Sequence, residues 1–509
     1  MIGTRRLASR WLPWLLALPA TAWGTDYDIT PSDDLWGTMQ ALVAGDTVTV
    51  HAGVYTRPGF FEVTWAGTES APIVVRAAAG DRPVLSGDAS QNMINLQGSY
   101  YVLSGFEIDG GSHGLRVAQS DHGTIEDMII HATGDVGLSM NRPGHDYGDM
   151  TVRRNEIYDT SGAGECMYLG CNDSMCRVHN SLIAANYCHD TGGTQGDGIE
   201  LKRGSYANVI RDNVVIRTNY PGILVYGADG MGANLVEGNF VHTVADNGIQ
   251  VAAEAVVRNN IVMFAGGSAL ASQPHQGVDP NYLSILHNTL YNPGGSCFRG
   301  SAWNIGAGLV LANNALYCEG GTALLFPDGP GVAVVTANVV AGAAPAAGTQ
   351  AARTALLDLL DAAAWNLYPT ADSPLVDSGD VTQSATRDFN GTPRDDGLPD
   401  PGAYEWTGVP NPGWIPVEDF REGSTTGADA GVSPDAGAGS DAAVDAVSPD
   451  GATDTDAGRD DGPDPATGGD LGCGCHLAAS PRAPGALVWL VAWAIGRRRT
   501  PLLRCPAPP

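Results

Sequence analysis

The body of the chain repeats a short pattern of apolar and polar positions. Each repeat has an apolar pair, an asparagine, a second apolar pair, a polar or glycine turn, and then glycine followed by alternating apolar residues. Such alternation predicts short strands with one buried face, and the turns are too frequent for helices between the strands. Gly105 and Asp127 are expected in the same position of the repeat, upstream of the asparagines. The asparagines recur every 21–31 residues and are Asn155, Asn186, Asn213, Asn239, Asn260, Asn288, Asn314 and Asn338.

This repetition predicts a solenoid of stacked strands. One unit alone cannot bury its apolar face, whereas stacked units share a continuous core. Asparagines at the same position of successive turns can form a ladder that satisfies buried backbone groups, as stacked amides do in cross-β arrays. We therefore expect an all-β fold, a parallel β-helix, with Asn155 through Asn338 in one column. The alternative is a β-propeller, although its blades need about 40 residues each.

The repeats VRRNEIYDTSGAGECMYL and IAANYCHDTGGTQGDGIELK resemble those of the pectate-lyase-like superfamily of right-handed parallel β-helix proteins. The segment LWGTMQALVAGDTVTVHAGVY resembles the cap and first coil of such proteins, and residues 373–406 resemble their C-terminal closing segment. The resemblance implies a right-handed parallel β-helix domain over residues 25–409. It implies the fold rather than the activity, because this fold hosts lyases, hydrolases, epimerases and non-enzymatic surface proteins.

The two ends of the chain differ from the body. Arginines 5, 6 and 10 precede an apolar stretch that ends at Ala22-Trp23-Gly24, which predicts a signal peptide over residues 1–24, with a short membrane anchor as the alternative. Residues 410–472 are rich in Asp, Ala, Gly and Pro, and positions 421–470 hold 12 acidic residues and two arginines. This composition predicts a disordered acidic linker.

The last segment, residues 473–509, contains Cys473, then the apolar run 486–495, then three arginines at 497–499. This order resembles the myxobacterial C-terminal sorting signal of the MYXO-CTERM type. The resemblance implies processing near Cys473, lipid attachment and display at the outer membrane, outside the cell. The alternative is a tail anchor with its arginines in the cytoplasm. We expect an exported, surface-attached monomer.

Charge limits the partners. The chain has 56 Asp and Glu against 27 Lys and Arg, a net charge of −29, which excludes a basic nucleic-acid binder. Without residues 1–24 and 410–509, 42 acidic and 17 basic residues remain. Average repulsion would slow the approach of a polyanionic substrate to such a body.

The body contains six cysteines, an even number that favours disulfide bonds in an exported chain. We expect one bond between Cys297 and Cys318, about one coil apart, and two local bonds among the other four. Zinc is the alternative, although no CxxC pair is present. The four local cysteines are Cys166, Cys171, Cys176 and Cys188.

One repeat carries the candidate chemistry. In Gly198-Ile199-Glu200-Leu201-Lys202, alternation turns Ile199 and Leu201 inward and Glu200 and Lys202 outward. The next coil places Tyr226 beside Lys202, which is the only lysine of the chain. A lone lysine among arginines is notable because Lys can act as a general base, whereas Arg stays protonated. The alternative is a surface ion pair of Glu200 with Lys202.

This group suits β-elimination from a uronic-acid polysaccharide. A hard cation such as Ca²⁺ would neutralise the sugar carboxylate and make the C5 proton more acidic. Lys202 would take that proton, Tyr226 would donate to the leaving oxygen, and His275 is a further catalytic candidate. The candidate metal ligands are Asp197, Glu200 and Gln195, and the candidate substrate-binding residues are Glu200, Arg203 and Gln250.

The stretch GDGIELKRGSYANVIRDN also resembles polysaccharide lyases of the chondroitinase B and alginate lyase type. The resemblance implies that Lys202 is the base, Asp197 is an acidic calcium ligand and Gln195 takes the place of the other. The neutral Gln195, and the absence of an arginine near Leu224 and Tyr226, depart from that pattern. A polysaccharide lyase is therefore the first hypothesis. A non-catalytic carbohydrate-binding or adhesive surface protein and a uronan C5-epimerase are the alternatives.

Overall fold

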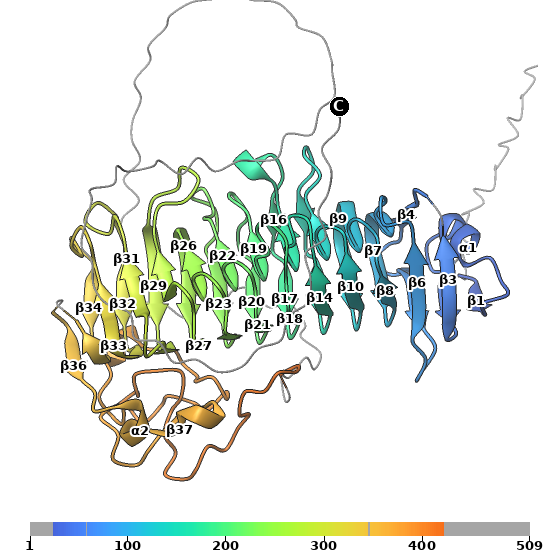
Figure 1. Ribbon diagram of the computed structural model, residues 1–509. Coiled ribbons are helices and arrows are strands. Elements are labelled where there is room, and N and C mark those ends of the chain that lie inside the picture. The colour runs from blue at the N-terminus through green and yellow to red at the C-terminus, as the bar shows by residue number, and fades with distance from the viewer. Residues whose placement is uncertain (1–23, 58, 345–346, 422–509) are drawn as a thin grey trace, which may run out of the picture. The chain divides into compact units, whose positions relative to one another are not determined.

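Stacked parallel strands form the body of the protein in the computed structural model, which describes residues 24–57, 59–344 and 347–421 (Figure 1). The described residues all belong to one compact unit. The predicted signal peptide, most of the predicted linker, and the sorting segment with Cys473 lie outside the described residues. No helix among the described residues is both long enough and apolar enough to cross a membrane.

Thirty-six of the strands in this part of the chain form one sheet with parallel pairing, wound into three faces. Face A, which carries the candidate site, comprises β4 (Glu62–Ala66), β7 (Ile94–Ser104), β9 (Leu115–Glu126), β11 (Leu138–Met140), β15 (Met167–Leu169), β19 (Ile199–Leu201), β22 (Ile223–Val225), β25 (Ile249–Val251), β28 (Ser268–Ser272), β31 (Ser296–Gly300) and the end of β33 (Ala315–Leu325).

The long strands β7 and β9 turn a corner and continue into face B. Face B further comprises β1 (Asp26–Ile29), β2 (Thr47–Val50), β5 (Ile73–Ala77), β13 (Thr151–Arg153), β17 (Leu182–Ala184), β20 (Val209–Arg211), β23 (Asn234–Glu237), β26 (Ala253–Arg258), β29 (Asn281–Leu286), β32 (Val310–Ala312) and β34 (Val334–Thr336). Two short strands pair beside these faces, β12 (Tyr147–Gly148) and β16 (Val178–His179).

Face C completes each coil. It comprises β3 (Gly53–Arg57), β6 (Pro83–Gly87), β8 (Glu107–Asp109), β10 (Ile129–Thr133), β14 (Glu156–Thr160), β18 (Tyr187–His189), β21 (Val214–Ile216), β24 (Phe240–His242), β27 (Ile261–Met263), β30 (Thr289–Tyr291), the start of β33, β35 (Asn338–Ala343) and β36 (Thr349–Ala351). The N-terminal cap is helix α1 (Leu35–Ala41), which buries Leu35, Trp36 and Met39.

The predicted asparagine ladder is confirmed. All eight asparagines are fully buried, and each accepts hydrogen bonds from the preceding rung. At one rung, the backbone N–H and the side-chain Nδ2 of Asn186 donate to Oδ1 of Asn213, over 3.0 and 2.9 Å. Nδ2 of Asn213 in turn donates to the carbonyl of Ile183 over 3.0 Å. The ladder therefore satisfies backbone groups that a tight turn leaves unpaired.

The prediction for the two upstream positions is wrong by one residue. The register pairs Ile129 with Glu156, so Met128 and not Asp127 occupies the position of Asn155. Met128 donates its backbone N–H to Oδ1 of Asn155. Gly105 and Asp127 instead occupy the preceding position, with φ of +86° and +56°. A left-handed residue is needed there because the chain turns sharply between two faces, and Gly and Asp tolerate that conformation.

The expected disulfide bonds are confirmed. Cys297 bonds with Cys318, and the four local cysteines form Cys166–Cys188 and Cys171–Cys176. All three bonds join buried cysteines within the solenoid core. Cross-linking in this way stabilises the fold mainly by restricting the unfolded chain.

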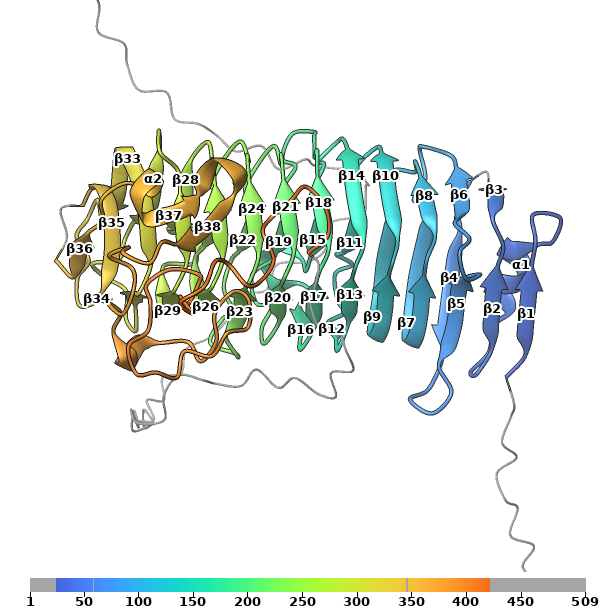
Figure 2. The same ribbon diagram turned by 90° about the horizontal axis from the view of Figure 1, so that it is seen from below.

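The C-terminal segment of the described chain covers the later part of face C, from β18 onward (Figure 2). It contains α2 (Ala355–Asp358), an antiparallel pair of β37 (Leu359–Asp361) and β38 (Asn366–Pro369), and the 3₁₀ turns Ala362–Ala364 and Val381–Gln383. Figure 2 shows this segment, in orange, lying across the coils of face C. Its apolar side chains and those of face C form a second core, separate from that of the solenoid.

This packing continues beyond residue 409. Trp414 and Phe420, which belong to the predicted linker, pack against the second core. Arg421 donates hydrogen bonds to Asp212 and to the carbonyls of Gly238 and Phe389. Residues 410–421 therefore lie on the folded body, because they carry the aromatic side chains that the rest of the linker lacks.

A buried histidine beneath this segment predicts acid sensitivity. Burial lowers the pKa of His242 to about 4, and its ring lies 4.3 Å from that of Trp365. The unfolded chain protonates this histidine below about pH 6.5 and the folded chain does not. The contribution of the neutral, buried His242 to the unfolding free energy should therefore be complete above pH 6.5. It should be lost progressively as the pH falls from 6.5 towards 4.

The variant His242→Phe should show a smaller loss of unfolding free energy over this pH range than the unmodified protein. Urea unfolding at several pH values measures the difference. The exposed His145→Phe is the control and should leave the pH dependence unchanged. An unchanged pH dependence in His242→Phe would contradict the prediction.

Candidate functional site

Strand β19 on face A positions the first part of the site. Ile199 and Leu201 are fully buried in the solenoid core, so the side chain of Glu200 between them faces outward, as the alternation predicts. Lys202 follows the strand and donates its backbone N–H to Leu169 of the previous coil. Tyr226, whose N–H binds the carbonyl of Leu201, occupies the matching position on the next coil.

These three side chains form one hydrogen-bonded group. Nζ of Lys202 lies 2.5 Å from Oε1 of Glu200 and 3.2 Å from the hydroxyl of Tyr226. The Tyr226 hydroxyl donates to the same Oε1 over 2.7 Å. Nζ also lies over two aromatic rings, 4.3 Å from the centroid of Tyr168 and 4.8 Å from that of Tyr226. The ammonium group is thus held by one carboxylate and two phenol rings.

The group is buried rather than superficial. Glu200 is 2% exposed and Lys202 3% exposed, so the alternative of a surface ion pair is wrong. The outward direction along the strand was predicted, but neighbouring side chains also cover this part of face A. A buried pair is costly to break, because a lone charge would remain in a poorly solvated site.

Two further carboxylates approach Glu200. Glu165 and Asp197 stand at the same position of successive coils. The backbone N–H of the residue that follows each of them makes the first hydrogen bond of the corresponding face A strand. Ligand oxygens of Glu165, Asp197 and Glu200 all lie within 4.8 Å of one another, and all three residues are buried. We call these residues the acidic triad. The protein thus concentrates three acidic groups beside a single lysine.

The acidic triad has unused hydrogen-bonding capacity. Both side-chain oxygens of Glu165, Oδ1 of Asp197 and Oε2 of Glu200 are buried without a hydrogen-bond partner among the described residues. Burial, with the charge of Glu200, raises the pKa of Glu165 to about 7 and that of Asp197 well above its usual range. Isolated buried carboxylates are costly, so this arrangement calls for protons or a cation.

The acidic triad fits a divalent cation. Its free atoms are oxygens, which Ca²⁺ prefers. Three carboxylates and one ammonium carry a formal charge of −2, which a divalent cation would cancel. Asp197 and Glu200 are two of the three predicted metal ligands, and they meet here. Gln195 lies in the preceding loop, where its backbone N–H binds the carbonyl of Ala163, and the described residues show no bond from its side chain to the triad.

Glu165 was missed by the sequence analysis, although a signal was present. In the two repeats GAGECMYL and QGDGIEL, Glu165 and Asp197 stand at the same distance before their strands. Aligning the repeats on their glycines would have placed the two acids on adjacent rungs.

The other predicted residues divide into two groups. His275 reaches the site, with its ring 4.6 Å from that of Tyr226 and its Nδ1 3.4 Å from Nε2 of Gln250. Burial lowers the pKa of His275, which therefore favours the neutral form. Gln250 is also bound by Asn247 over 2.8 Å. Arg203 instead pairs with Asp229 over 2.8 Å and lines a separate cavity of about 480 Å³.

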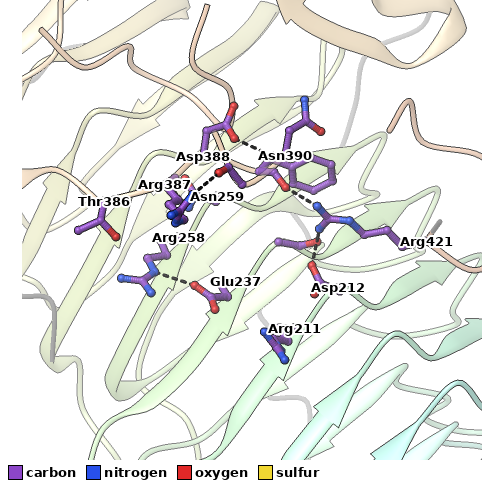
Figure 3. Close-up of a pocket in the computed structure, with 13 residues that line it drawn as sticks. Arg211, Asp212, Glu237, Arg258, Asn259, Thr386, Arg387, Asp388, Asn390 and Arg421 are labelled. Carbon is purple, nitrogen blue, oxygen red and sulfur yellow. Dashed lines mark hydrogen bonds and ion pairs between the residues drawn. The ribbon is translucent and has the colours of Figure 1, made fainter. Parts of the chain in front are cut away.

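A cavity of about 530 Å³ lies between the ends of the face B strands β20, β23 and β26 and the C-terminal segment (Figure 3). Its charged side chains satisfy one another. Arg258 pairs with Glu237 over 2.8 Å, and Arg421 pairs with Asp212 over 2.5 Å. These ion pairs identify the cavity as part of the contact between the solenoid and the C-terminal segment. The cavity contains none of the candidate catalytic residues.

Comparisons with known proteins agree with this fold. Residues 20–172, less than a third of the chain, match the family model "Pel9A-like, right handed beta helix region". No curated protein matches the sequence. The structure of XylC in complex with xylose matches at 11% identity and a TM-score of 0.51, over 75% of this chain and 98% of that chain.

Two other solved structures resemble the chain less closely in shape. Pectate lyase Pel9A matches at 17% identity and a TM-score of 0.46, over 76% of this chain and 98% of that chain. The alginate lyase from Paenibacillus sp. str. FPU-7 matches at 18% identity and a TM-score of 0.35, over 54% of this chain and 93% of that chain. The stacked parallel coils, the family-model match and the likeness to the XylC structure identify the fold as a right-handed parallel β-helix.

Proposed function

We propose that the protein is a surface polysaccharide lyase that cleaves a uronic-acid polysaccharide by β-elimination at Lys202. The observation that carries the proposal is the acidic triad with its unpartnered oxygens, placed directly beside a buried Lys202–Tyr226 pair. This arrangement brings together a cation site, a base and a proton donor. Export and attachment at the cell surface belong to the same proposal and rest on the two ends of the sequence.

The acidic triad would hold Ca²⁺, which when bound would neutralise the uronate carboxylate and make the C5 proton more acidic. Lys202 would pass a proton to Oε1 of Glu200, at 2.5 Å, and would then take the C5 proton. The C5–H electron pair would form the C4=C5 double bond as the bond from C4 to the glycosidic oxygen breaks. Burial and the charge of Glu200 raise the pKa of Tyr226 well above its usual range. The phenol therefore keeps its proton and can donate it to the leaving glycosidic oxygen.

A second candidate function follows from the burial of the site. Lys202 and Tyr226 are only 3% and 2% exposed, so a sugar reaches Nζ only after neighbouring side chains move. If they do not move, the triad holds a structural cation, and the protein is a non-catalytic carbohydrate-binding surface protein. The two candidates make different predictions for turnover.

The test is incubation of the purified protein with pectate, alginate and glycosaminoglycans, with and without Ca²⁺. A lyase produces the ultraviolet absorbance of an unsaturated uronate, which should disappear with EDTA and return when Ca²⁺ is added. Conversion of the sugar configuration without chain cleavage would instead indicate the C5-epimerase. Binding without either product would leave the carbohydrate-binding alternative and contradict the lyase.

A further inference from the structure

A second charged position lies on face A, on the N-terminal side of the acidic triad. Register pairs Arg116 with Ser139, Ser139 with Tyr168, and Tyr168 with Glu200. Arg116 is therefore in the same outward column as Glu200, between the fully buried Leu115 and Val117. Three strand spacings of about 4.8 Å place the two residues about 14 Å apart along the solenoid.

Arg116 is an arginine without a counter-charge on face A. Within the described residues, its side chain makes no ion pair, and its Nε is buried without a hydrogen-bond partner. By contrast, Arg153 and Arg154 on face B bind Glu126 and Asp127 over 2.7 Å. A partly buried guanidinium without an anion is unfavourable, so this position is suited to an anion from outside the chain.

The titratable groups near Arg116 include His113. The nearby carboxylate of Asp135 faces His113, with 3.5 Å between its Oδ2 and Nε2 of the histidine. Nδ1 of the same histidine lies 3.1 Å from the hydroxyl of Ser139. Burial, together with the charge of Arg116, lowers the pKa of His113, although Asp135 opposes this effect. Asp135 thus faces His113, and the described residues show no ion pair between Asp135 and Arg116.

A second polar atom on this part of face A is also unsatisfied. Oδ1 of Asn141, two residues after Ser139, is buried without a partner among the described residues. The Arg116 guanidinium supplies donors and the Asn141 amide supplies both donors and an acceptor, which is the combination that a carboxylate and a hydroxyl of one sugar require.

We propose that Arg116 forms an anionic subsite that binds a carboxylate of the same uronan, on the N-terminal side of the acidic triad. The proposal rests on the proposed function, since it takes the polymer to lie along face A. It also addresses the repulsion between the negatively charged body of the protein and a polyanionic substrate. An unpaired arginine beside the path of the polymer provides local attraction where the average charge repels.

The test compares Arg116→Gln with the paired Arg153→Gln, both in the Lys202→Arg background so that turnover does not consume the polymer. Isothermal titration with polygalacturonate and with alginate measures Kd. Because Arg116→Gln loses a charge-assisted hydrogen bond, this variant should bind the polymer roughly 10- to 100-fold more weakly than its parent. Arg153→Gln should bind as tightly as the parent. Arg116→Lys keeps the positive charge and should lose less affinity than Arg116→Gln. If Arg116→Gln does not fold, Arg116→Lys replaces it in the comparison with the parent.

A carboxyl-reduced form of the same polymer separates charge from shape. Arg116→Gln and its parent should bind the reduced polymer equally, and added salt should weaken the parent more steeply than Arg116→Gln. Equal affinity of Arg116→Gln and its parent for the charged polymer would overturn the subsite. If the parent binds the polymer but the unmodified protein, with Lys202 in place, yields no unsaturated product, the lyase is refuted and the subsite stands. A parent that binds no uronan would refute both.

Discussion

Replacing Lys202 with arginine should abolish lyase turnover while leaving the solenoid folded. Arginine keeps the positive charge and can still pair with Glu200, but it does not release its proton at working pH. Loss of a general base costs roughly 10²–10⁴-fold in rate. The measurement is the initial rate of unsaturated-uronate formation on the polymer that the unmodified protein cleaves, with the melting temperature recorded for each variant.

The structure makes a structural control necessary for this experiment. Lys202 is enclosed by two phenol rings and Glu200, so a larger guanidinium strains its surroundings. Lys202→Gln, which is smaller and uncharged, should be equally inactive if the base is what matters. Arg153→Lys on face B should retain full activity. A fully active Lys202→Arg would place the chemistry elsewhere on face A, with Tyr226 and His275 the next residues to test.

Removing one rung of the asparagine ladder should destabilise the solenoid strongly. Asn213→Ala leaves the backbone N–H and the side-chain Nδ2 of Asn186 without their acceptor. It also removes a donor from the carbonyl of Ile183. Two buried orphaned donors at about 1–3 kcal/mol each predict a loss of about 2–6 kcal/mol in unfolding free energy.

Urea unfolding gives the magnitude, and hydrogen exchange gives its location. Each coil contacts mainly its neighbours, so protection should fall most in the coils on either side of Asn213. The exposed Asn304→Ala is the matched control and should change stability by less than about 0.5 kcal/mol. A loss in Asn213→Ala no larger than in this control would mean that the ladder is not a source of stability.

Local periodicity was enough to predict the fold and part of the site. The period-two alternation predicted which residues enter the core, and Glu200, Lys202 and Tyr226 lie where it placed them. The recurring asparagines predicted the ladder, because a stacked solenoid brings equal positions of successive repeats together. The even number of cysteines predicted oxidation, and the one-coil spacing of Cys297 and Cys318 predicted their bond.

The exact position of the ladder within the turn could be determined only from the structure. Gly105 and Asp127 looked equivalent to the asparagines because all of them favour turns. Only the strand register showed that they precede the ladder by one residue. A left-handed residue and a ladder asparagine are adjacent in every such turn, and propensity alone does not distinguish the two positions.

By itself, the sequence determined the coil, its inward and outward positions, the ladder and the rung that carries Lys202. These depend on contacts between equal positions of adjacent repeats, which a periodic pattern records. Only the tertiary structure decided that Glu165 completes the acidic triad, that Glu200 and Lys202 are buried, and that Arg116 lacks a counter-charge. Burial and pairing depend on which side chains meet across several coils and loops, and no single repeat encodes that information.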